Sequence, residues 1–119
     1  MAQHNELGEI GEQIAVDFLI KNGYKILERN YRYIKAEVDI IAQKADVLAI
    51  VEVKTRSTDH FGNPQDFVNP KKIKLLLSAI DHYVIQRELD LEVRFDIIAI
   101  IYQKNNIKIE HLEDAFLHF

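Results

Sequence analysis

The sequence predicts an α/β fold in which helices flank a mixed five-stranded sheet, with elements in the order α-β-β-β-α-β-β. Two segments show apolar residues at helical spacing, and five others have the short apolar or alternating pattern of strands. The second helical segment separates the third strand from the fourth, so these two strands can pair in parallel across a helical crossover. With 119 residues, the chain is expected to form one compact domain spanning residues 1–119.

The first helix is predicted between Gly8 and Asn22, and Gly23 is a natural C-terminal cap. The helical period rests on five apolar residues: Ile10, Ile14, Ala15, Phe18 and Leu19. Residues 24–33 then alternate as a strand. Two apolar strands follow at 37–42 and 48–54, and the short polar break between them suits a hairpin.

Residues 57–70 read as a loop. Asn69 and Pro70 are typical of a helix cap and first position, so the second helix is expected from Pro70 to about Gln86. Residues 93–102 are nearly all apolar after Asp96, as in a central strand buried on both faces. Residues 107–112 alternate and form the expected last strand.

The composition, 48% hydrophobic and 29% charged, is that of a globular protein. The absence of cysteine excludes disulfides, thiolate metal sites and a cysteine nucleophile. The first residues lack the pattern of a secretory signal, and no apolar run is long enough to span a bilayer. We therefore expect a soluble cytoplasmic protein with no membrane association.

The net charge of −4 argues mildly against a protein that coats DNA non-specifically. Positive residues nevertheless gather on both sides of the strand that contains Asp39, and bound cations would offset several acids. The basic residues before and after it are Lys21, Lys25, Arg29, Arg32 and Lys35, then Lys54, Arg56, Lys71, Lys72 and Lys74.

Carboxylates interrupt both apolar strands of the predicted hairpin. Asp39 lies among apolar residues, and Glu52 and Lys54 end an almost wholly apolar run on one strand face. Burying such ions costs several kcal/mol each unless each finds a partner or a metal, so a site is favoured over chance decoration. If the two strands pair, Asp39, Glu52 and Lys54 can converge on one point.

This set of residue types suits phosphodiester hydrolysis with a divalent metal. Asp39 and Glu52, with the backbone carbonyl of Val53 as a third donor, offer the hard oxygen ligands that Mg²⁺ or Mn²⁺ prefers. Lys54 would then orient the attacking water or stabilise charge on the phosphate. The alternative is a half-exposed sheet whose outward residues happen to be charged.

Glu12 lies at the edge of the apolar stripe of the first helix, close to Gly8 and Gly11. These glycines let something approach the helix backbone closely: either a ligand or a strand packed against the helix. We expect Glu12 to bind a second metal or to orient a metal-bound water.

Three basic residues are candidates for nucleic-acid binding. Arg56 continues the strand face of Lys54 and could hold a phosphate, or it could pair with Glu37 or Glu52. Lys71 and Lys72 open the second helix, where they could contact phosphate or remain solvated.

Three further features complete the predictions. Arg94 and Asp96 share a strand face, which favours a buried ion pair that braces the sheet. The loop at residues 60–62 is a candidate flap over the site. The five histidines show no metal-ligand spacing.

Asp39 followed by Glu52-Val53-Lys54 resembles the PD-(D/E)xK signature of the restriction-endonuclease-like superfamily, with Val38 in place of the proline. Wider segments, in one order along the chain, are similar to the YraN-like family of small bacterial predicted endonucleases, which is distantly similar to archaeal Holliday junction resolvases. These segments are 8–15, 18–19, 23–24, 26–27, 29–30, 37–42, 51–56 and 94–96. The resemblance implies a restriction-endonuclease-like core with Asp39, Glu52 and Lys54 at the catalytic positions and Glu12 at the place of the helix glutamate of the resolvases.

The leading hypothesis is a Mg²⁺- or Mn²⁺-dependent nuclease acting on branched or structured DNA, because a single small domain would grip backbone and shape rather than sequence. Resolvase-type cleavage of two strands would require a homodimer, with an exposed sheet end or residues 116–119 as the interface. Two alternatives remain open: a nucleic-acid-binding module that does not cleave, and an adaptor that docks a protein partner.

Overall fold

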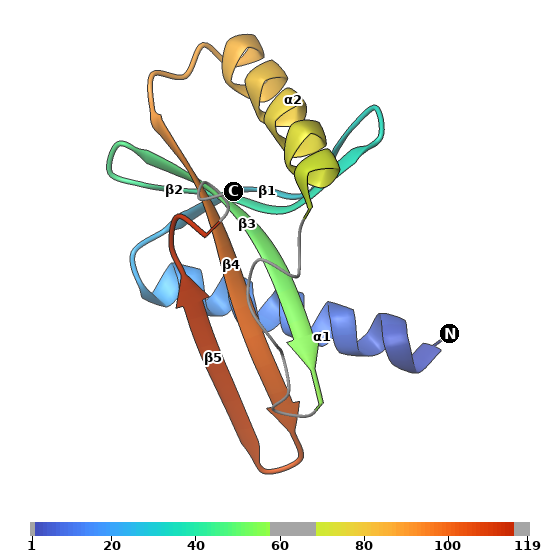
Figure 1. Ribbon diagram of the computed structural model, residues 1–119. Coiled ribbons are helices and arrows are strands. Elements are labelled where there is room, and N and C mark those ends of the chain that lie inside the picture. The colour runs from blue at the N-terminus through green and yellow to red at the C-terminus, as the bar shows by residue number, and fades with distance from the viewer. Residues whose placement is uncertain (1, 58–68, 116–119) are drawn as a thin grey trace.

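The computed structural model describes residues 2–57 and 69–115, and the side chains within these ranges from residue 6 onward. The predicted flap at 60–62 and tail at 116–119 lie outside the described residues. The elements are α1 (Ala2–Lys21), β1 (Lys25–Tyr33), β2 (Ala36–Lys44), β3 (Val47–Arg56), α2 (Pro70–Gln86), β4 (Glu92–Gln103) and β5 (Asn106–Leu112) (Figure 1). The predicted α/β class and the order α-β-β-β-α-β-β are confirmed.

The five strands form one mixed sheet in the order β1-β2-β3-β4-β5. β3 pairs with β4 in parallel, as the helical crossover predicted, and the other neighbours are antiparallel. Two-residue turns join the strands of each antiparallel hairpin. Because such short connections force neighbouring strands to be antiparallel, only the pair separated by α2 is parallel.

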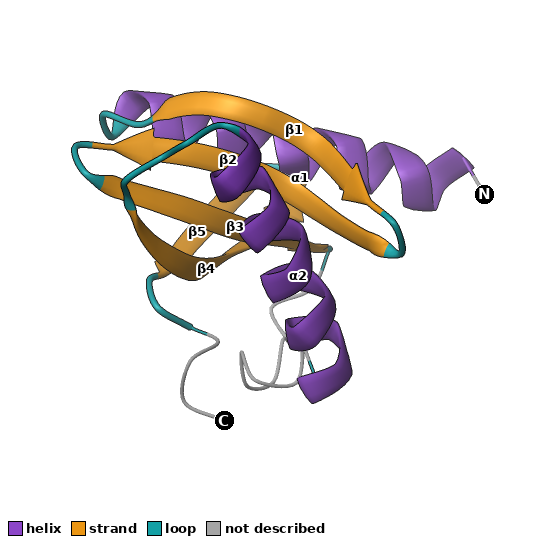
Figure 2. Ribbon diagram, turned by 90° about the horizontal axis from the view of Figure 1, so that it is seen from above, coloured by secondary structure: helices purple, strands orange, loops and turns teal. Residues whose placement is uncertain are grey.

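The two helices cover opposite faces of the sheet, as Figure 2 shows. Leu76, Ala79, Ile80 and Tyr83 of α2 pack into one apolar cluster. Ala15, Val16 and Leu19 of α1 pack into a second cluster on the other face. The sheet is therefore buried on both sides in its middle, which explains the continuous apolar runs of β3 and β4.

Most predicted boundaries agree with the structure within one or two residues, and α1 is the exception. It begins at Ala2, not Gly8, because polar residues extend the helix beyond its apolar stripe. α2 begins where predicted, since the Asn69 side chain accepts a hydrogen bond from the Lys72 backbone N–H at 2.8 Å and Pro70 follows it. Neither described helix is long and apolar enough to cross a membrane.

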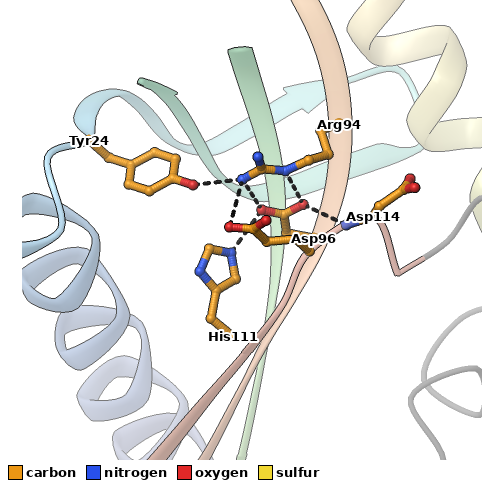
Figure 3. A network of polar contacts seen from close by, with 6 residues as sticks. Tyr24, Arg94, Asp96, His111 and Asp114 are labelled. Atoms are coloured by element: carbon orange, nitrogen blue, oxygen red, sulfur yellow. Dashed lines mark hydrogen bonds and ion pairs between the residues drawn. The ribbon is translucent and has the colours of Figure 1, made fainter. Parts of the chain in front are cut away.

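Asp96 is fully buried at the centre of a polar network on the α1 face of the sheet (Figure 3). Arg94 donates to both carboxylate oxygens at 2.8 and 2.9 Å, and it also donates to the Tyr24 hydroxyl at 2.6 Å. His111 contacts the carboxylate at 2.8 Å and the Asp114 N–H donates to it at 3.1 Å. The predicted ion pair is thus confirmed, and it joins β4 to β5 and to the residue that precedes β1.

These partners decide the charge of Asp96. Burial raises its pKa, but the hydrogen bonds from His111, Arg94 and Asp114 outweigh burial and hold the pKa below its usual 3.8. The same interaction raises the pKa of Arg94 above its usual value. Asp96 is therefore ionised in the folded protein at neutral pH, as a structural counterion.

Replacing Asp96 by Asn should lower the free energy of unfolding by about 3 kcal/mol or more at pH 7, because it leaves the Arg94 charge without its buried partner. The lowered pKa means that the stabilisation is present above about pH 4 and is lost as pH falls through the folded-state pKa. Urea unfolding at pH 7 and below pH 4 measures both effects. Equal stability of variant and wild type at pH 7 would contradict the assignment.

Candidate functional site

The site begins where β2 and β3 separate. Their pairing extends from Lys44–Val47 to Ile40–Val51 and stops there, although β2 starts at Ala36 and β3 continues to Arg56. In Figure 1, β1 and β2 lie across the molecule while the second half of β3 continues beside β4. The separation leaves backbone groups of β3 without partners on β2.

Asp39 fills the first of these vacancies. Its carboxylate accepts a hydrogen bond from the Val53 N–H at 2.8 Å, in place of a carbonyl of β2. Because the N–H and C=O of one strand residue point to the same side, the Val53 carbonyl also faces the gap. The side chain of Asp39 and the backbone of Val53 therefore meet between the diverging strands.

A break in the side-chain alternation of β2 accompanies the divergence. Ala36 and Val38 pack in the cluster on the α2 face, whereas Ile40 and Ala42 pack in the cluster on the α1 face. Regular alternation would place all four on one face. The shift occurs at Asp39, which explains how its carboxylate reaches the space between the strands.

The surroundings of Asp39 favour its protonated form. Burial and the charge of Glu52 raise its pKa to about 7, with a further upward contribution from Glu12, while the Val53 N–H and Lys72 act in the opposite direction. Burial and the nearby carboxylates therefore make the negative charge of Asp39 unfavourable unless a further cation is present.

Glu52 is buried, and its position is fixed by lysines from two elements. One carboxylate oxygen lies 2.6 Å from the Lys72 ammonium of α2 and 3.6 Å from that of Lys54 on its own strand. Its side chain is only 8% exposed, so these contacts supply the charge compensation that burial requires.

Glu12 reaches the other side of the gap from α1. One of its oxygens accepts hydrogen bonds from Asn30 at 3.0 Å and from two nitrogens of Arg29 at 3.3 and 3.4 Å. Asn30 has a left-handed backbone with φ of 55°, which bends β1. Asparagine tolerates this conformation better than most residues, so it can bend the strand and hold Glu12 as well.

Close packing of α1 on β3 brings Glu12 to the site. A Cβ at Gly11 would lie 2.8 Å from Thr55 Cβ and 2.9 Å from Thr55 Cγ2, so only glycine fits at this contact. A Cβ at Gly8 would meet no atom within 4 Å. Gly11 therefore serves strand packing, one of the two alternatives that the sequence left open, whereas Gly8 borders open space.

Two neighbouring cavities flank Asp39. The larger, of about 730 Å³, is bordered by the charged residues Glu9, Glu12, Arg29, Arg32, Glu37, Asp39, Lys54 and Arg56. The smaller, of about 350 Å³, is bordered by Glu52 and Lys72 among others. Asp39 and Glu37 border both, so the predicted residues surround one branching depression.

Asp39, Glu52 and the Val53 carbonyl fit a divalent cation by the chemistry of their oxygen donors, and a bound cation would offset the unfavourable ionisation of Asp39. Within residues 2–57 and 69–115, however, no three carboxylate or imidazole groups are arranged to hold an ion together. Lys72 contacts Glu52, and Arg29 contacts Glu12. A cation at Asp39 would thus have at most two protein carboxylates and would need water or substrate oxygens as well.

The structure brings Glu12, Asp39, Glu52, Lys54, Arg56 and Lys72 together around the two cavities. Lys71 is exposed and borders neither of them. The carboxylates proposed as partners of Arg56 have other cations beside them: Glu37 pairs with Arg32 at 3.3 Å, and Glu52 pairs as described above. The contact between Lys72 and Glu52 was not predicted from the sequence.

Two residues of the site were missed as functional candidates: Arg29 and Asn30. Arg29 and Asn30 contact Glu12, from which they are separated by 17 and 18 positions in the sequence, respectively. Three sequence signals pointed to them: Arg29 is one of the basic residues near the Asp39 strand, segment 29–30 is similar to the YraN-like family, and asparagine is uncommon within a strand.

Gly11→Ala should lower the free energy of unfolding by about 1–3 kcal/mol, because the new methyl group overlaps Thr55 on β3. Gly8→Ala is the matched control on the same helix and should be neutral or slightly stabilising, since alanine favours helix. Urea denaturation of the two variants provides the comparison. Equal losses in both would show that helix propensity, not the contact with Thr55, determines the effect.

The raised pKa of Asp39 predicts a pH dependence of stability. The folded state binds this proton more tightly than the unfolded state, so the contribution of Asp39 is fully present below about pH 4 and is lost as pH rises through about 7. Asp39→Asn cannot ionise, so its stability relative to wild type should increase over this window and level off above it. Unfolding curves in chelator at pH 5, 6, 7 and 8 test this; parallel profiles would refute it.

Comparison with known proteins identifies the family. The family model described as "Uncharacterised protein family UPF0102" matches residues 11–100. UPF0102 proteins of Flavobacterium psychrophilum and Christiangramia forsetii are 60% and 62% identical over 119 residues, covering all of both chains. One of Phocaeicola vulgatus is 46% identical over 116 residues, covering 98% of this chain and 96% of its own. This chain therefore belongs to the UPF0102 family.

Proposed function

We propose that the protein is a metal-dependent nuclease that hydrolyses DNA phosphodiester bonds with Mg²⁺ or Mn²⁺. The observation that carries the proposal is the meeting of Asp39, the Val53 backbone and Lys54 at the cavity between β2 and β3, with Glu52 beside them. The similarity of Asp39 and Glu52-Val53-Lys54 to the PD-(D/E)xK signature, and of the chain to the YraN-like predicted endonucleases, supports the same reaction.

Asp39, Glu52 and the Val53 carbonyl would hold the cation. A divalent metal supplies an activated water and neutralises charge on the phosphate. Lys54 contributes a fixed ammonium that orients the water or the non-bridging oxygens. Glu12, held by Arg29 and Asn30 at the opposite wall of the cavity, would orient a metal-bound water.

The rim of the larger cavity suits an anionic polymer. Arg29, Arg32 and Arg56 are all exposed at its border, and Arg29 also contacts Glu12. Guanidinium groups bind phosphate through two parallel hydrogen bonds, so these residues would grip the DNA backbone without reading its sequence. The small domain has few other elements for base recognition, which favours DNA recognised by its shape, such as branched DNA.

One observation favours a second candidate function, DNA binding without cleavage. The Lys72 ammonium lies 2.6 Å from the Glu52 carboxylate, so it occupies the oxygen that would otherwise bind a metal. A fold that keeps this ion pair could bind phosphates at the basic rim and still fail to bind a metal at Glu52.

The deciding experiment incubates labelled linear, flapped, single-stranded and four-way-junction DNA with the protein in Mg²⁺, Mn²⁺ or chelator. Asp39→Asn and Glu52→Gln should reduce metal-dependent cleavage by at least about 100-fold, since even residues that only orient metal ligands cost 10–100-fold. Asp90→Asn is the matched control, because this exposed acid lies between α2 and β4 and borders neither site cavity.

Cleavage that requires metal, and that is lost in the two site variants but retained in Asp90→Asn, would support the nuclease. Salt-dependent binding without cleavage in all four proteins would overturn it in favour of the binding module. Neither cleavage nor binding would overturn both and leave the protein-adaptor hypothesis.

A further inference from the structure

β5 forms one edge of the sheet and pairs with β4 alone among the described strands (Figure 1). A two-residue turn joins β4 to β5, so Gln103 and Asn106 close the hairpin as a hydrogen-bonded pair. Hydrogen-bonded and non-hydrogen-bonded pairs then alternate along the strand. The backbone N–H and C=O groups of Ile107, Ile109 and His111 therefore point outward, away from β4.

The side chains of β5 divide into an apolar and a charged face. Ile107 and Ile109 are 48% and 36% exposed, and they share the α1 face with His111. Lys108 and Glu110 are exposed on the α2 face, and within the described residues neither makes an ion pair. An open strand edge with exposed isoleucines is a template for pairing with another strand.

The opposite edge of the sheet lacks these properties. β1 has a register shift between Ile26 and Glu28 and a left-handed residue at Asn30. Bulges and kinks of this kind twist an edge away from regular pairing. The pairing of β5 with β4 runs from Asn106 to Leu112 without a shift, so β5 is the edge suited to extend the sheet.

We propose that two copies of this chain associate through β5, antiparallel about a two-fold axis at Ile109, to form one continuous ten-stranded sheet. With the axis at this residue, Ile109 lies opposite the partner's Ile109, and Ile107 lies opposite the partner's His111. These are the residues whose backbone groups point outward, so each pair can exchange two hydrogen bonds. The inference is independent of the proposed nuclease activity.

Charge complementarity selects this register. The two-fold axis sets Lys108 opposite the partner's Glu110, and symmetry produces this pair twice. Moving the axis two residues toward the turn sets Lys108 opposite the partner's Asn106 instead. Moving it two residues the other way sets Glu110 opposite the partner's Leu112. Moving the axis by one residue sets Lys108 opposite the partner's Lys108, or Glu110 opposite the partner's Glu110, so that like charges meet.

Charge reversal tests the register by sedimentation equilibrium of the full chain over a range of concentrations. Wild type should dimerise, and Lys108→Glu or Glu110→Lys alone should raise the dimer Kd by about tenfold or more, because each puts two like-charged pairs across the axis. The double variant Lys108→Glu/Glu110→Lys should restore dimerisation. Lys74→Glu, on the exposed side of α2, is the control and should dimerise as wild type does.

A single cysteine gives an independent measurement, because the chain contains none of its own. Hydrogen-bonded strand pairs place Cα atoms about 5.5 Å apart, within the range of a disulfide. Ile109→Cys should therefore form a disulfide-linked dimer on mild oxidation, whereas Ile34→Cys, exposed at the β1–β2 turn, should not. A monomeric wild type, dimers insensitive to the single reversals, or equal cross-linking of both cysteine variants would overturn the proposal.

Discussion

The candidate site depends on the separation of β2 from β3 after the Ile40–Val51 pair. A regular hairpin would satisfy the Val53 N–H with a backbone carbonyl and close the sheet at this point. Here the carboxylate of Asp39 takes the carbonyl's place, so the two strands can diverge while the half-buried Val53 N–H keeps its partner. One side-chain-to-backbone hydrogen bond thus allows a cavity to open inside an otherwise continuous sheet.

The helices then bring charge to this opening from opposite faces. The glycine contact with Thr55 lets α1 approach β3 closely enough for Glu12 to reach the cavity wall. From the other face, the first turn of α2 places Lys72 on Glu52. The acidic centre is therefore surrounded by cations on three elements, an arrangement that holds buried carboxylates in place and presents positive charge to an anionic ligand.

The Asp96 network has a different role, although its composition is similar. Its centre, the carboxylate of Asp96, is buried, and both of its oxygens accept hydrogen bonds or contacts from Arg94, His111 and the Asp114 N–H. Its pKa is lowered, whereas that of Asp39 is raised to about 7. The contrast distinguishes a carboxylate that locks β4 to β5 from one whose surroundings favour an additional positive charge.

The sequence by itself determined the elements and the set of chemical groups. Periodicity placed both helices and all five strands, Asn69 and Pro70 fixed the start of α2, and the crossover helix predicted the one parallel strand pair. These features follow from local rules of spacing and capping, so they can be read along the chain. The acids within apolar strands likewise marked Asp39 and Glu52, because burying charge without a partner is costly.

Only the tertiary structure decided how these groups meet. Alternation along β2 does not reveal the break at Asp39, which arises where β2 leaves β3. Nor does the sequence show that Lys72 pairs with Glu52 across 20 positions, or that Asn30 holds Glu12 across 18. Such contacts join residues whose separation along the chain carries no information about distance, and they are set by the packing of helices on the two faces of the sheet.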